Sequence, residues 1–516
     1  MKAINLTDGY KVDHGRQYPV GTELVYSNFT PRKSRNPEIN QVVFFGLQYF
    51  IKKYLIEEYG KWFSQPEDVA VTQYKRRIDN YLGANHGITF DHIKALHHLG
   101  YLPVTIKAVK EGSLVPMRVA PLTITNTIPE FYWVVNYLET LLSCTLWGMC
   151  TSATTAHTYK TILSDWAMKT VGNTDFVKFQ GHDFSFRGMF GVEAAQISGA
   201  AHLTSFVGTD TIPAIDFLEE YYDANSDNEL IGCSVAATEH AVMCMGTGLY
   251  IYDKYNGDWS YQGEAEFAMF KRLLTEVYPS GIISVVSDTW NLWSVITDYL
   301  PRLKDIIMAR DGKLVIRPDS GDPVDILCGD KTSGDIAISK GLIECLWDTF
   351  GGTVSDMGYK VLDGHVGAIY GDSITTERAK NICERLADKG FASINTVLGI
   401  GSYTYQYVTR DTFGWAMKAT YGEVKTPDGR VLDIEIFKDP ITDDGTKKSA
   451  RGLLCINESE NGLVMEDCRN WEQESAGALQ IVFKNGELVR KTSLSEIRNV
   501  LEQASVQKVD QVLDVL

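Results

Sequence analysis

Apolar residues in the middle of the chain occur in short runs, and each run ends in a polar cluster. Seven such runs, rich in Val and Ile, follow one another between about residue 175 and residue 405. They are VKFQGHDFSFRG (177–188), SFVGTDT (205–211), CSVAATEH (233–240), IISVVSDT (282–289), KLVIRPDSGDP (313–323), HVGAIYGDS (365–373) and INTVLGIGS (394–402). Strands that are apolar on both faces are typical of parallel sheets.

The spacing of these runs predicts the strand–helix repeats of an α/β fold. Most successive polar ends are about 30 residues apart, which is the length of one strand with its return helix, and two gaps have room for an insertion. A helical pattern at 375–391 lies between two of the runs. We predict a (β/α) barrel, closed or incomplete, with a doubly wound open sheet as the alternative. Either fold places functional sites at the carboxyl ends of its strands.

The two ends of the chain follow different patterns. Segments 47–59 and 66–83 have helical periodicity, 104–109 and 119–125 are strand-like, and apolar 130–148 predicts a buried helix. After about residue 405, Pro-Asp-Gly and Asn-Gly between alternating segments predict hairpins. We therefore expect a mixed α/β segment at 1–150, the barrel at 151–405, and a β-rich segment at 406–516 that packs with the first as a second, α+β domain.

Length and composition agree with a multidomain globular protein. The chain has 516 residues, 44% of them apolar and 22% charged, which suits two or three domains. The net charge of -17 argues against nucleic acid as a partner, because nucleic acid needs a basic surface. Small anions stay open as ligands, since a local cluster of Arg and Lys can bind phosphate inside an acidic protein.

Cysteine usage and hydropathy predict a cytoplasmic protein. The nine cysteines form no Cys-x-x-Cys pair, which indicates free thiols in a reduced compartment. The N-terminal residues contain no apolar signal core. No window approaches the roughly 18 apolar residues that a membrane span needs.

The polar clusters at the strand ends suggest a site for a charged ligand. They contain Asp183, Arg187, Asp210, Glu239, His240, Asp288, Arg317, Asp319 and Asp372. A single Asp after a strand often caps the next helix, but so many charged groups on one rim favour an anionic ligand and a metal. Arginine forks, to which Arg410 can be added, suit phosphate oxygens. Asp residues beside phosphates commonly organise Mg²⁺.

Three local features sharpen this prediction. IRPDSGDP (316–323) places Arg, Asp, Ser and Gly directly after an apolar strand, a combination that core packing does not require. GIGS (399–402) offers bare backbone N–H groups at a strand end, where barrels often bind phosphate. His240 follows Glu239, so it is either a structural histidine or a group that accepts a proton or a phosphoryl group.

These residues resemble the nicotinamide phosphoribosyltransferase family, which consists of type II phosphoribosyltransferases related to nicotinate phosphoribosyltransferase. The resemblance covers nearly the whole chain. It runs through TDGYKVDH (7–14), FFGLQYF (44–50), IKAVKEG (106–112), HDFSFRG (182–188), GTDT (208–211), AATEH (236–240), SVVSD (284–288), IRPDSGDP (316–323), GD (371–372), GIGS (399–402), VTRD (408–411) and FKDP (437–440).

The resemblance implies an enzyme of NAD salvage that joins nicotinamide to phosphoribosyl pyrophosphate, with Mg²⁺ and with ATP as a co-substrate. It implies a homodimer with two active sites at the subunit interface. Phe184 and Tyr10, the latter from the partner chain, would sandwich the pyridine ring. Asp210 would accept a hydrogen bond from the carboxamide, and Arg187 would lie on the ring side of the pocket.

The resemblance also implies roles in phosphate binding and catalysis. Arg317, Asp319, Gly371, Asp372, Gly401 and Ser402 match the phosphoribosyl site. Arg32, Arg410, Lys418 and Lys438 match the basic pyrophosphate site, partly across the dimer. His240 matches the histidine that ATP phosphorylates. Asp288 and Asp319 are expected to hold the metal, directly or through water, and His240, Asp288, Asp319 and Arg317 are the expected catalytic set.

Two departures from the family pattern stand out, and three alternatives stay open. The loop GIGSYTYQ lacks the longer glycine run of the family. Gly367 replaces an arginine that in the family contacts adenosine or ribose groups, and this bears on the strength of ATP coupling.

The alternatives are a nicotinate phosphoribosyltransferase, a catalytically inactive binding or signalling homologue, and an unrelated barrel hydrolase. Asp210 argues against the first, and the intact Arg317, Asp319, Asp372 and Arg410 argue against the second. The third leaves the arginines and the GIGS loop unexplained.

Overall fold

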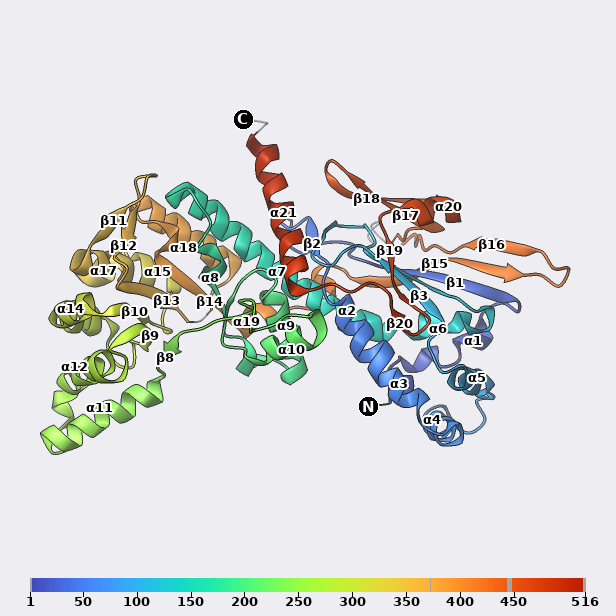
Figure 1. Ribbon diagram of the computed structural model, residues 1–516, viewed down its shortest axis with the longest axis horizontal. Helices are drawn as coiled ribbons and strands as arrows, with labels where there is room; N and C mark the ends of the chain where they lie inside the picture. Colours follow the sequence, from blue (N-terminus) through green and yellow to red (C-terminus); the bar gives the residue numbers. More distant parts are fainter. Residues whose placement is uncertain (1, 372, 443–447, 514–516) are drawn as a thin grey trace. The chain divides into compact units, whose positions relative to one another are not determined.

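The computed structural model describes residues 2–371, 373–442 and 448–513 (Figure 1). The chain forms two compact units. The first, which we call the terminal unit, combines the residues up to Thr154 with Phe217–Asn225 and the residues from Val408 onward. The second, which we call the barrel unit, comprises Thr155–Asp216 and Ser226–Tyr407.

A seven-stranded parallel sheet forms the centre of the barrel unit. Its strands are β6 (Gly181–Asp183), β7 (Gly208–Thr209), β8 (Ala236–Ala237), β9 (Ser280–Val286), β10 (Asp311–Arg317), β13 (Val366–Tyr370) and β14 (Thr396–Ile400). Each of the seven apolar runs overlaps one of these strands, and every neighbouring pair is parallel. The prediction of a parallel α/β core is therefore confirmed.

The order of the strands is that of an incomplete barrel. It reads β7-β6-β14-β13-β10-β9-β8, so the first strand pairs with the last and the others follow chain order. A doubly wound sheet would instead reverse direction at a switch point inside the sheet. Among the described residues, edge strand β7 meets the segment that precedes edge strand β8 at an isolated bridge between Gly208 and Cys233. Closure at this edge is therefore weaker than elsewhere in the sheet.

Helices pack on the outer surface of this sheet. They include α11 (His240–Tyr255), α12 (Gln262–Arg272), α14 (Leu300–Ala309), α17 (Leu342–Phe350) and α18 (Thr376–Asp388), and the same unit also contains α9 (Val192–His202). On β10, Leu314 and Ile316 are buried in the core with residues of these helices. The alternate residues Lys313, Val315 and Arg317 line an interior pocket. Successive side chains of a strand point to opposite faces of the sheet, so every second residue of β10 packs in the core and the residues between them face the pocket.

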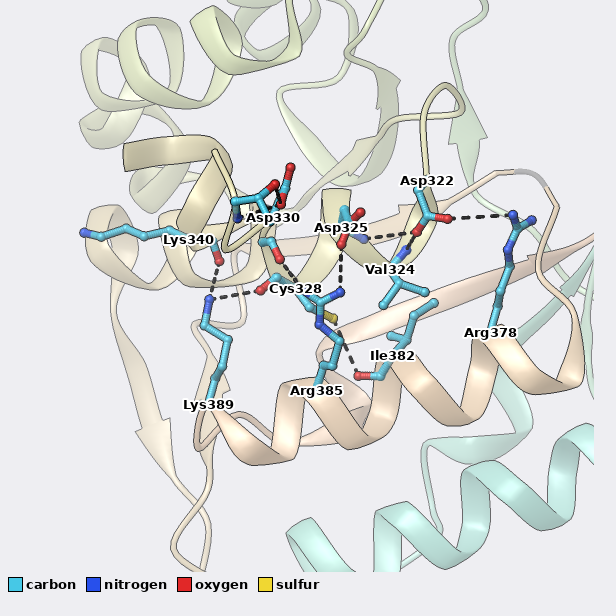
Figure 2. A network of polar contacts seen from close by, with 12 residues as sticks. Asp322, Val324, Asp325, Cys328, Asp330, Lys340, Arg378, Ile382, Arg385 and Lys389 are labelled. Carbon is cyan, nitrogen blue, oxygen red and sulfur yellow. Dashed lines mark hydrogen bonds and ion pairs between the residues drawn. The ribbon is translucent and has the colours of Figure 1, made fainter. Parts of the chain in front are cut away.

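Basic side chains of α18, and of Lys389 just after it, bind the helix and loop that follow β10 (Figure 2). Arg385 Nη1 donates to Asp325 Oδ1 at 2.7 Å, on α15 (Pro323–Cys328). Lys389 Nζ donates to the carbonyl of Cys328 at 3.0 Å. Arg378 donates to the carbonyl of Ser373 at 2.7 Å and pairs with Asp322 at 3.7 Å. This network fixes the chain beyond β10 and β13, where two predicted phosphate-binding motifs lie.

The terminal unit is built around an antiparallel sheet from both chain ends. Its order is β16-β15-β1-β5-β3-β19-β20. The strands are β1 (Thr22–Thr30), β3 (Val104–Ala108), β5 (Leu122–Asn126), β15 (Ala416–Lys425), β16 (Val431–Glu435), β19 (Gln480–Lys484) and β20 (Glu487–Leu488). Both predicted hairpins are present, and Asn485 and Gly486 have φ of 49° and 88° at the second turn. The predicted second domain, mixed α+β and made from both ends, is confirmed.

The predicted helices of the N-terminal segment are present, but one is longer than expected. Helical residues run continuously from α2 (Leu47–Phe50) to α3 (Tyr59–Phe63), and α4 spans Glu67–Leu82. The apolar segment 130–148 forms α6 (Tyr132–Tyr137) and the start of α7, which continues from Glu139 to Val171. Ser and Thr dilute the pattern after 148, yet buried apolar residues continue at helical spacing.

A buried carboxylate links the short segment 217–225 to the terminal unit. Glu111 accepts hydrogen bonds from the backbone N–H groups of Gly46 and Gln48 at 2.6 and 2.7 Å, and from the Tyr222 hydroxyl at 3.0 Å. Buried polar groups of this kind are stable when their partners are all in place.

Among the described residues, no helix is both long enough and apolar enough to span a bilayer.

Candidate functional site

The barrel sheet encloses a pocket of about 460 Å³ whose lining extends from the amino ends of the strands, at Val366 and Thr396, to their carboxyl ends. His182, Phe184, Asp210, Ser234 and Arg317 line its mouth. Four of them lie at or just beyond the carboxyl ends of β6, β7 and β10, and Ser234 precedes β8. The pocket continues inward along β10 past Val315 to Lys313. It is therefore an elongated cavity with polar groups at the mouth and mostly apolar walls farther in, as in many small-molecule sites.

An aromatic wall forms one side of the mouth. The ring of Phe184 lies 4.5 Å from that of His182, with 34° between the ring planes. A Cβ on Gly399 would stand 2.8 Å from Phe184 Cδ2 and 2.7 Å from the Tyr370 carbonyl oxygen. Glycine at 399 therefore allows Phe184 to lie against β14. This wall suits a flat aromatic ring.

Asp210 lies beside this wall as an ionised carboxylate. Its Oδ1 accepts hydrogen bonds from His182 Nε2 at 2.8 Å and from Ser234 Oγ at 2.7 Å. Burial favours a raised pKa of Asp210, but the His182 and Ser234 contacts and the charge of Arg317 outweigh it and lower that pKa. Within the described ranges Oδ2 accepts no hydrogen bond. One oxygen is thus available to a ligand that carries N–H groups.

Two acidic residues and a histidine meet at the ends of β8, β9 and β10. Asp288 Oδ2 accepts hydrogen bonds from the backbone N–H groups of Asp319 and Ser320 at 3.0 and 2.9 Å, and also from the Ser320 hydroxyl. His240 contacts Asp319 Oδ1 through Nε2 at 3.3 Å and Thr289 Oγ1 through Nδ1 at 3.1 Å. One ligand atom from each of His240, Asp288 and Asp319 lies within 4.8 Å of the others.

This cluster fits Mg²⁺. The Oδ1 atom of Asp288 is buried and has no hydrogen-bond partner in the part of the chain that the structure describes. Mg²⁺ binds oxygen and usually keeps several waters, so one or two carboxylates are sufficient protein ligands. Asp288 and Asp319 meet this requirement. His240 suits Mg²⁺ less well, because imidazole prefers softer metals.

Small residues bring two further loops close to this mouth. A Cβ on Gly371 would lie 3.4 Å from Asp319 Cβ and 3.9 Å from Arg317 Cδ. A Cβ on Gly188 would collide with Ser402 Oγ, so the turn that carries Arg187 adjoins the GIGS loop. Gly401 directly precedes α19 (Ser402–Gln406). The predicted residue Asp372 lies outside the described residues.

The remaining predicted residues lie in the terminal unit. A pocket of about 310 Å³ there is lined by Asp8, Tyr10, Arg32, Glu139, Thr140, Ser143, Cys144, Trp147, Arg410, Ala416, Met417 and Lys418. Partial burial lowers the pKa of Lys418, and the charges of Arg32, Lys11 and Lys438 lower it further, against the opposing effect of Glu139. Lys438 is not part of the lining, but its charge acts on Lys418. Such crowded cations favour an anionic ligand.

The predicted residues thus form two groups, and the structure corrects two details. Asp183 is fully buried and accepts a hydrogen bond from the Ser185 N–H at 2.9 Å, so it braces the loop after β6 rather than facing the mouth. The acid beside His240 is Asp319 instead of Glu239. Sequence reasoning missed His182 and Ser234 as partners of Asp210, although His182 stands within the quoted HDFSFRG motif.

We predict that anion binding in the terminal-unit pocket weakens at alkaline pH. Because the pKa of Lys418 lies below the ordinary lysine value of about 10.4, its positive charge is lost at a lower pH than that of an ordinary lysine. Sulfate keeps its charge over this range, so calorimetric titration with sulfate from about pH 7 to about pH 10 should show falling affinity. Lys418→Arg should flatten the profile, and an equal decline in that variant would contradict the assignment.

The sequence matches two family models. Residues 179–487 match the nicotinate phosphoribosyltransferase family, and residues 3–106 match the N-terminal domain of nicotinamide phosphoribosyltransferase. A nicotinamide phosphoribosyltransferase from Acinetobacter baylyi is 50% identical over 98% of this chain and 97% of its own length. Its counterpart from Mycoplasma pneumoniae is 35% identical over 88% of this chain and 95% of its own length.

Two solved structures resemble the fold over nearly the whole chain. Human nicotinic acid phosphoribosyltransferase superposes with a TM-score of 0.55 at 16% sequence identity, covering 97% of this chain and 94% of that chain. The nicotinate-nucleotide pyrophosphorylase of Pyrococcus furiosus gives a TM-score of 0.54 at 15% identity, covering 98% and 96%. At such identities the likeness extends to the fold alone.

Proposed function

The chain belongs to the nicotinamide phosphoribosyltransferase family of pentosyltransferases, and we propose that it joins nicotinamide to C1 of phosphoribosyl pyrophosphate, releasing nicotinamide mononucleotide and pyrophosphate. The observation that carries this proposal is the ionised Asp210 beside an aromatic wall, with Arg317 at the same mouth. A carboxylate at this place favours an uncharged amide over a carboxylate as the ring substituent. The alternative of nicotinate as the substrate is therefore disfavoured.

Recognition of the base follows from the free oxygen of Asp210. With Oδ1 bonded to His182 and Ser234, Oδ2 accepts a hydrogen bond from the carboxamide while the pyridine ring stacks on Phe184. Nicotinate would place a second negative charge there. Two like charges about 4 Å apart repel by about 4 kcal/mol at an effective dielectric constant near 20, and solvent at the open mouth reduces this value.

The transfer needs no nucleophilic side chain. The lone pair of the pyridine nitrogen forms the bond to C1 while the bond from C1 to the pyrophosphate oxygen breaks, and its electron pair leaves with pyrophosphate. The nitrogen carries no proton, so none has to be removed. We infer an oxocarbenium-like transition state, as in other glycosyl transfers. The protein contributes alignment of the two substrates.

Cationic and small residues hold the phosphate groups in this proposal. Arg317, Asp319, Gly371, Asp372, Gly401 and Ser402 bind the ribose phosphate portion, and Arg187 lies on the ring side. Asp288 and Asp319 hold Mg²⁺ directly or through water. When bound, Mg²⁺ neutralises charge on the pyrophosphate. Arg32, Arg410, Lys418 and Lys438 provide the positive charge that receives the departing anion.

We further propose a homodimer whose sites combine the two groups of residues. The strands β7, β6 and β14 are neighbours, and each is followed by exposed apolar side chains. Ile212 is 68% exposed after β7, Phe190 87% after β6, and Tyr403 and Tyr407 62% and 79% after β14. Exposed apolar groups clustered at one end of a unit are typical of an interface. A partner's terminal-unit pocket, with Tyr10 and Arg410, would cover this surface.

His240 supports a role for ATP. Its imidazole is accessible and is held between Asp319 and Thr289, which is a favourable position for accepting a phosphoryl group. Gly367 replaces the arginine of the family pattern, so we expect this chain's coupling to ATP to be weaker than in the family.

The central prediction concerns the choice of base. With phosphoribosyl pyrophosphate and Mg²⁺, the protein should form the mononucleotide from nicotinamide far better than from nicotinate, as measured by chromatography of the products. Asp210→Asn removes the repelling charge, so the ratio of the two kcat/KM values should fall about 10- to 100-fold. An unchanged ratio would overturn the role of Asp210. Absence of product from either base would support the inactive homologue instead.

A second prediction concerns ATP. Addition of ATP should raise kcat/KM and should label the protein with acid-labile phosphate when the γ-phosphate is radioactive. His240→Ala should abolish both the label and the stimulation while retaining some ATP-independent turnover. Labelling that persists in His240→Ala would place the phosphate elsewhere.

The shared site can be tested by mixing two inactive variants. Arg317→Ala damages the barrel unit and Arg410→Ala damages the terminal unit. If each site draws on both subunits, a coexpressed mixed dimer has one intact site, and an equal mixture should recover about a quarter of the wild-type activity. Arg317→Ala with Asp319→Ala, both in the barrel unit, is the matched control and should recover nothing. Equal recovery in both mixtures, or in neither, would contradict the shared site.

A further inference from the structure

Two side chains hold the same oxygen of Asp210, the carboxylate that recognises the base in the proposed function. Asp210 Oδ1 accepts one hydrogen bond from His182 Nε2 at 2.8 Å and another from Ser234 Oγ at 2.7 Å. Because Asp210 is ionised, it can only accept hydrogen bonds, so Nε2 of His182 carries the proton in this contact. Among the described residues, both donors use Oδ1, and Oδ2 stays open to a ligand.

The backbone places these two donors on opposite sides of β7. Gly208 of β7 pairs with His182 of β6 on one side and with Cys233, the residue before Ser234, on the other. The N–H of Thr209 in β7 also donates to the Cys233 carbonyl at 3.0 Å. Asp210 follows Thr209 directly, so its carboxylate lies where donors from both neighbouring segments can reach it.

A second layer of buried side chains fixes the place of the His182 ring. A Cβ on Gly208 would stand 2.9 Å from His182 Nδ1, so the glycine provides the room that the ring occupies. The Gly208 carbonyl lies 3.0 Å from Nε2 of His202, and His202 Nδ1 lies 2.7 Å from the Tyr405 hydroxyl. His202 is fully buried, and burial lowers its pKa, so its neutral ring has one N–H. A carbonyl only accepts, so this N–H points to Gly208 and the hydroxyl donates to Nδ1.

We propose that His182 and Ser234 are positioning residues that set the base specificity of the site. Together they hold Oδ1 of Asp210, so that Oδ2 is directed to the N–H of the carboxamide. The ring of His182 also supports the ring of Phe184, 4.5 Å away. This inference rests on the proposed function. Both residues act through Asp210 on the binding of the base and leave the transfer step unaffected.

A neutral analogue tests this geometry apart from charge. The ketone 3-acetylpyridine keeps the ring and the carbonyl group of nicotinamide, but a methyl group replaces the amide nitrogen with its N–H donors. The preference for nicotinamide over this ketone therefore reports the hydrogen bond to Oδ2. Since the acceptor is charged, wild-type protein should bind nicotinamide about 10- to 100-fold more tightly than the ketone. Calorimetric titration with each base, at one fixed pH for all variants, gives this preference.

Two replacements of His182 separate the hydrogen bond from the ring. In His182→Gln an amide N–H replaces Nε2 as the donor, so the preference should stay within about twofold of wild type. His182→Phe keeps a ring beside Phe184 but has no donor, so the preference should fall about fivefold. Loss of the ring contact affects both bases alike and cancels in the preference. KM for nicotinamide should follow its affinity, with kcat within about twofold of wild type.

The second donor is tested in the same way. Ser234→Ala should lower the preference about fivefold, whereas Ser234→Thr, which keeps the hydroxyl group, should retain it. Combining His182→Phe with Ser234→Ala leaves Oδ1 without either donor, so the carboxylate can rotate and the preference should approach unity. Ser234 is exposed, so Ser234→Ala keeps the inference testable if His182→Phe does not fold.

The matched control is His365→Gln. His365 Nδ1 lies 2.6 Å from Asp363 Oδ1, which makes a second His–Asp pair in the barrel unit, and His365 is not in the described pocket lining. This variant should keep the wild-type preference and KM. Thermal unfolding of every variant shows whether a loss of affinity comes from misfolding.

The outcomes distinguish this inference from the proposed function. Wild-type protein that forms no mononucleotide, as measured by chromatography, refutes the function itself. If the mononucleotide forms, equal binding of the two bases by wild type, or a wild-type preference in the folded double variant, overturns the inference alone. A fall in kcat without a loss of affinity also overturns it. A preference that disappears in the double variant but persists in His182→Gln, Ser234→Thr and His365→Gln supports it.

Discussion

Parallel pairing of the barrel strands is the constraint from which the site follows. Arg317 of β10 is paired with Val286 of β9, so residues two positions further along each strand, Asp319 and Asp288, stand side by side. The hydrogen bond between the Asp319 N–H and Asp288 is a direct result of this register. In the same way Asp183 of β6 is paired with both Ile400 and Thr209, which places Phe184, Gly401 and Asp210 at one level.

Most of this arrangement could be predicted from sequence because it depends on local pattern. Short apolar runs, each with a polar end, identify parallel strands and their carboxyl ends without knowledge of which strands pair. Asn485–Gly486 specifies its own hairpin for a similar reason, since few residues adopt the left-handed conformation that the turn needs. The barrel order then follows from chain order and right-handed crossovers.

What escaped prediction depends on contacts between distant residues. β6 has three residues, too few for a period of two to show that His182 faces the pocket. Ser234 lies before β8 in an irregular segment, and its bond to Asp210 exists because β7 and this segment meet at the bridge between Gly208 and Cys233. The sequence alone suggests the adjacent Glu239 as the acidic neighbour of His240, whereas the register of β8, β9 and β10 places Asp319 there.

Both sheets pair strands that are far apart in the sequence, and this has a consequence for biogenesis. β1 lies between β5 and β15, with Thr30 beside Ala416. In the barrel sheet, β6 pairs with β14, which follows it in the sequence by more than 200 residues. During synthesis the barrel sheet cannot be completed before Ile400 of β14 has been made, and the sheet of the terminal unit not before Leu488 of β20. Until then, unpaired strand edges and apolar surfaces remain open to other chains, as in proteins of high contact order. The barrel sheet can therefore form while the rest of the chain is being made, whereas the sheet of the terminal unit is among the last parts of the protein to be completed.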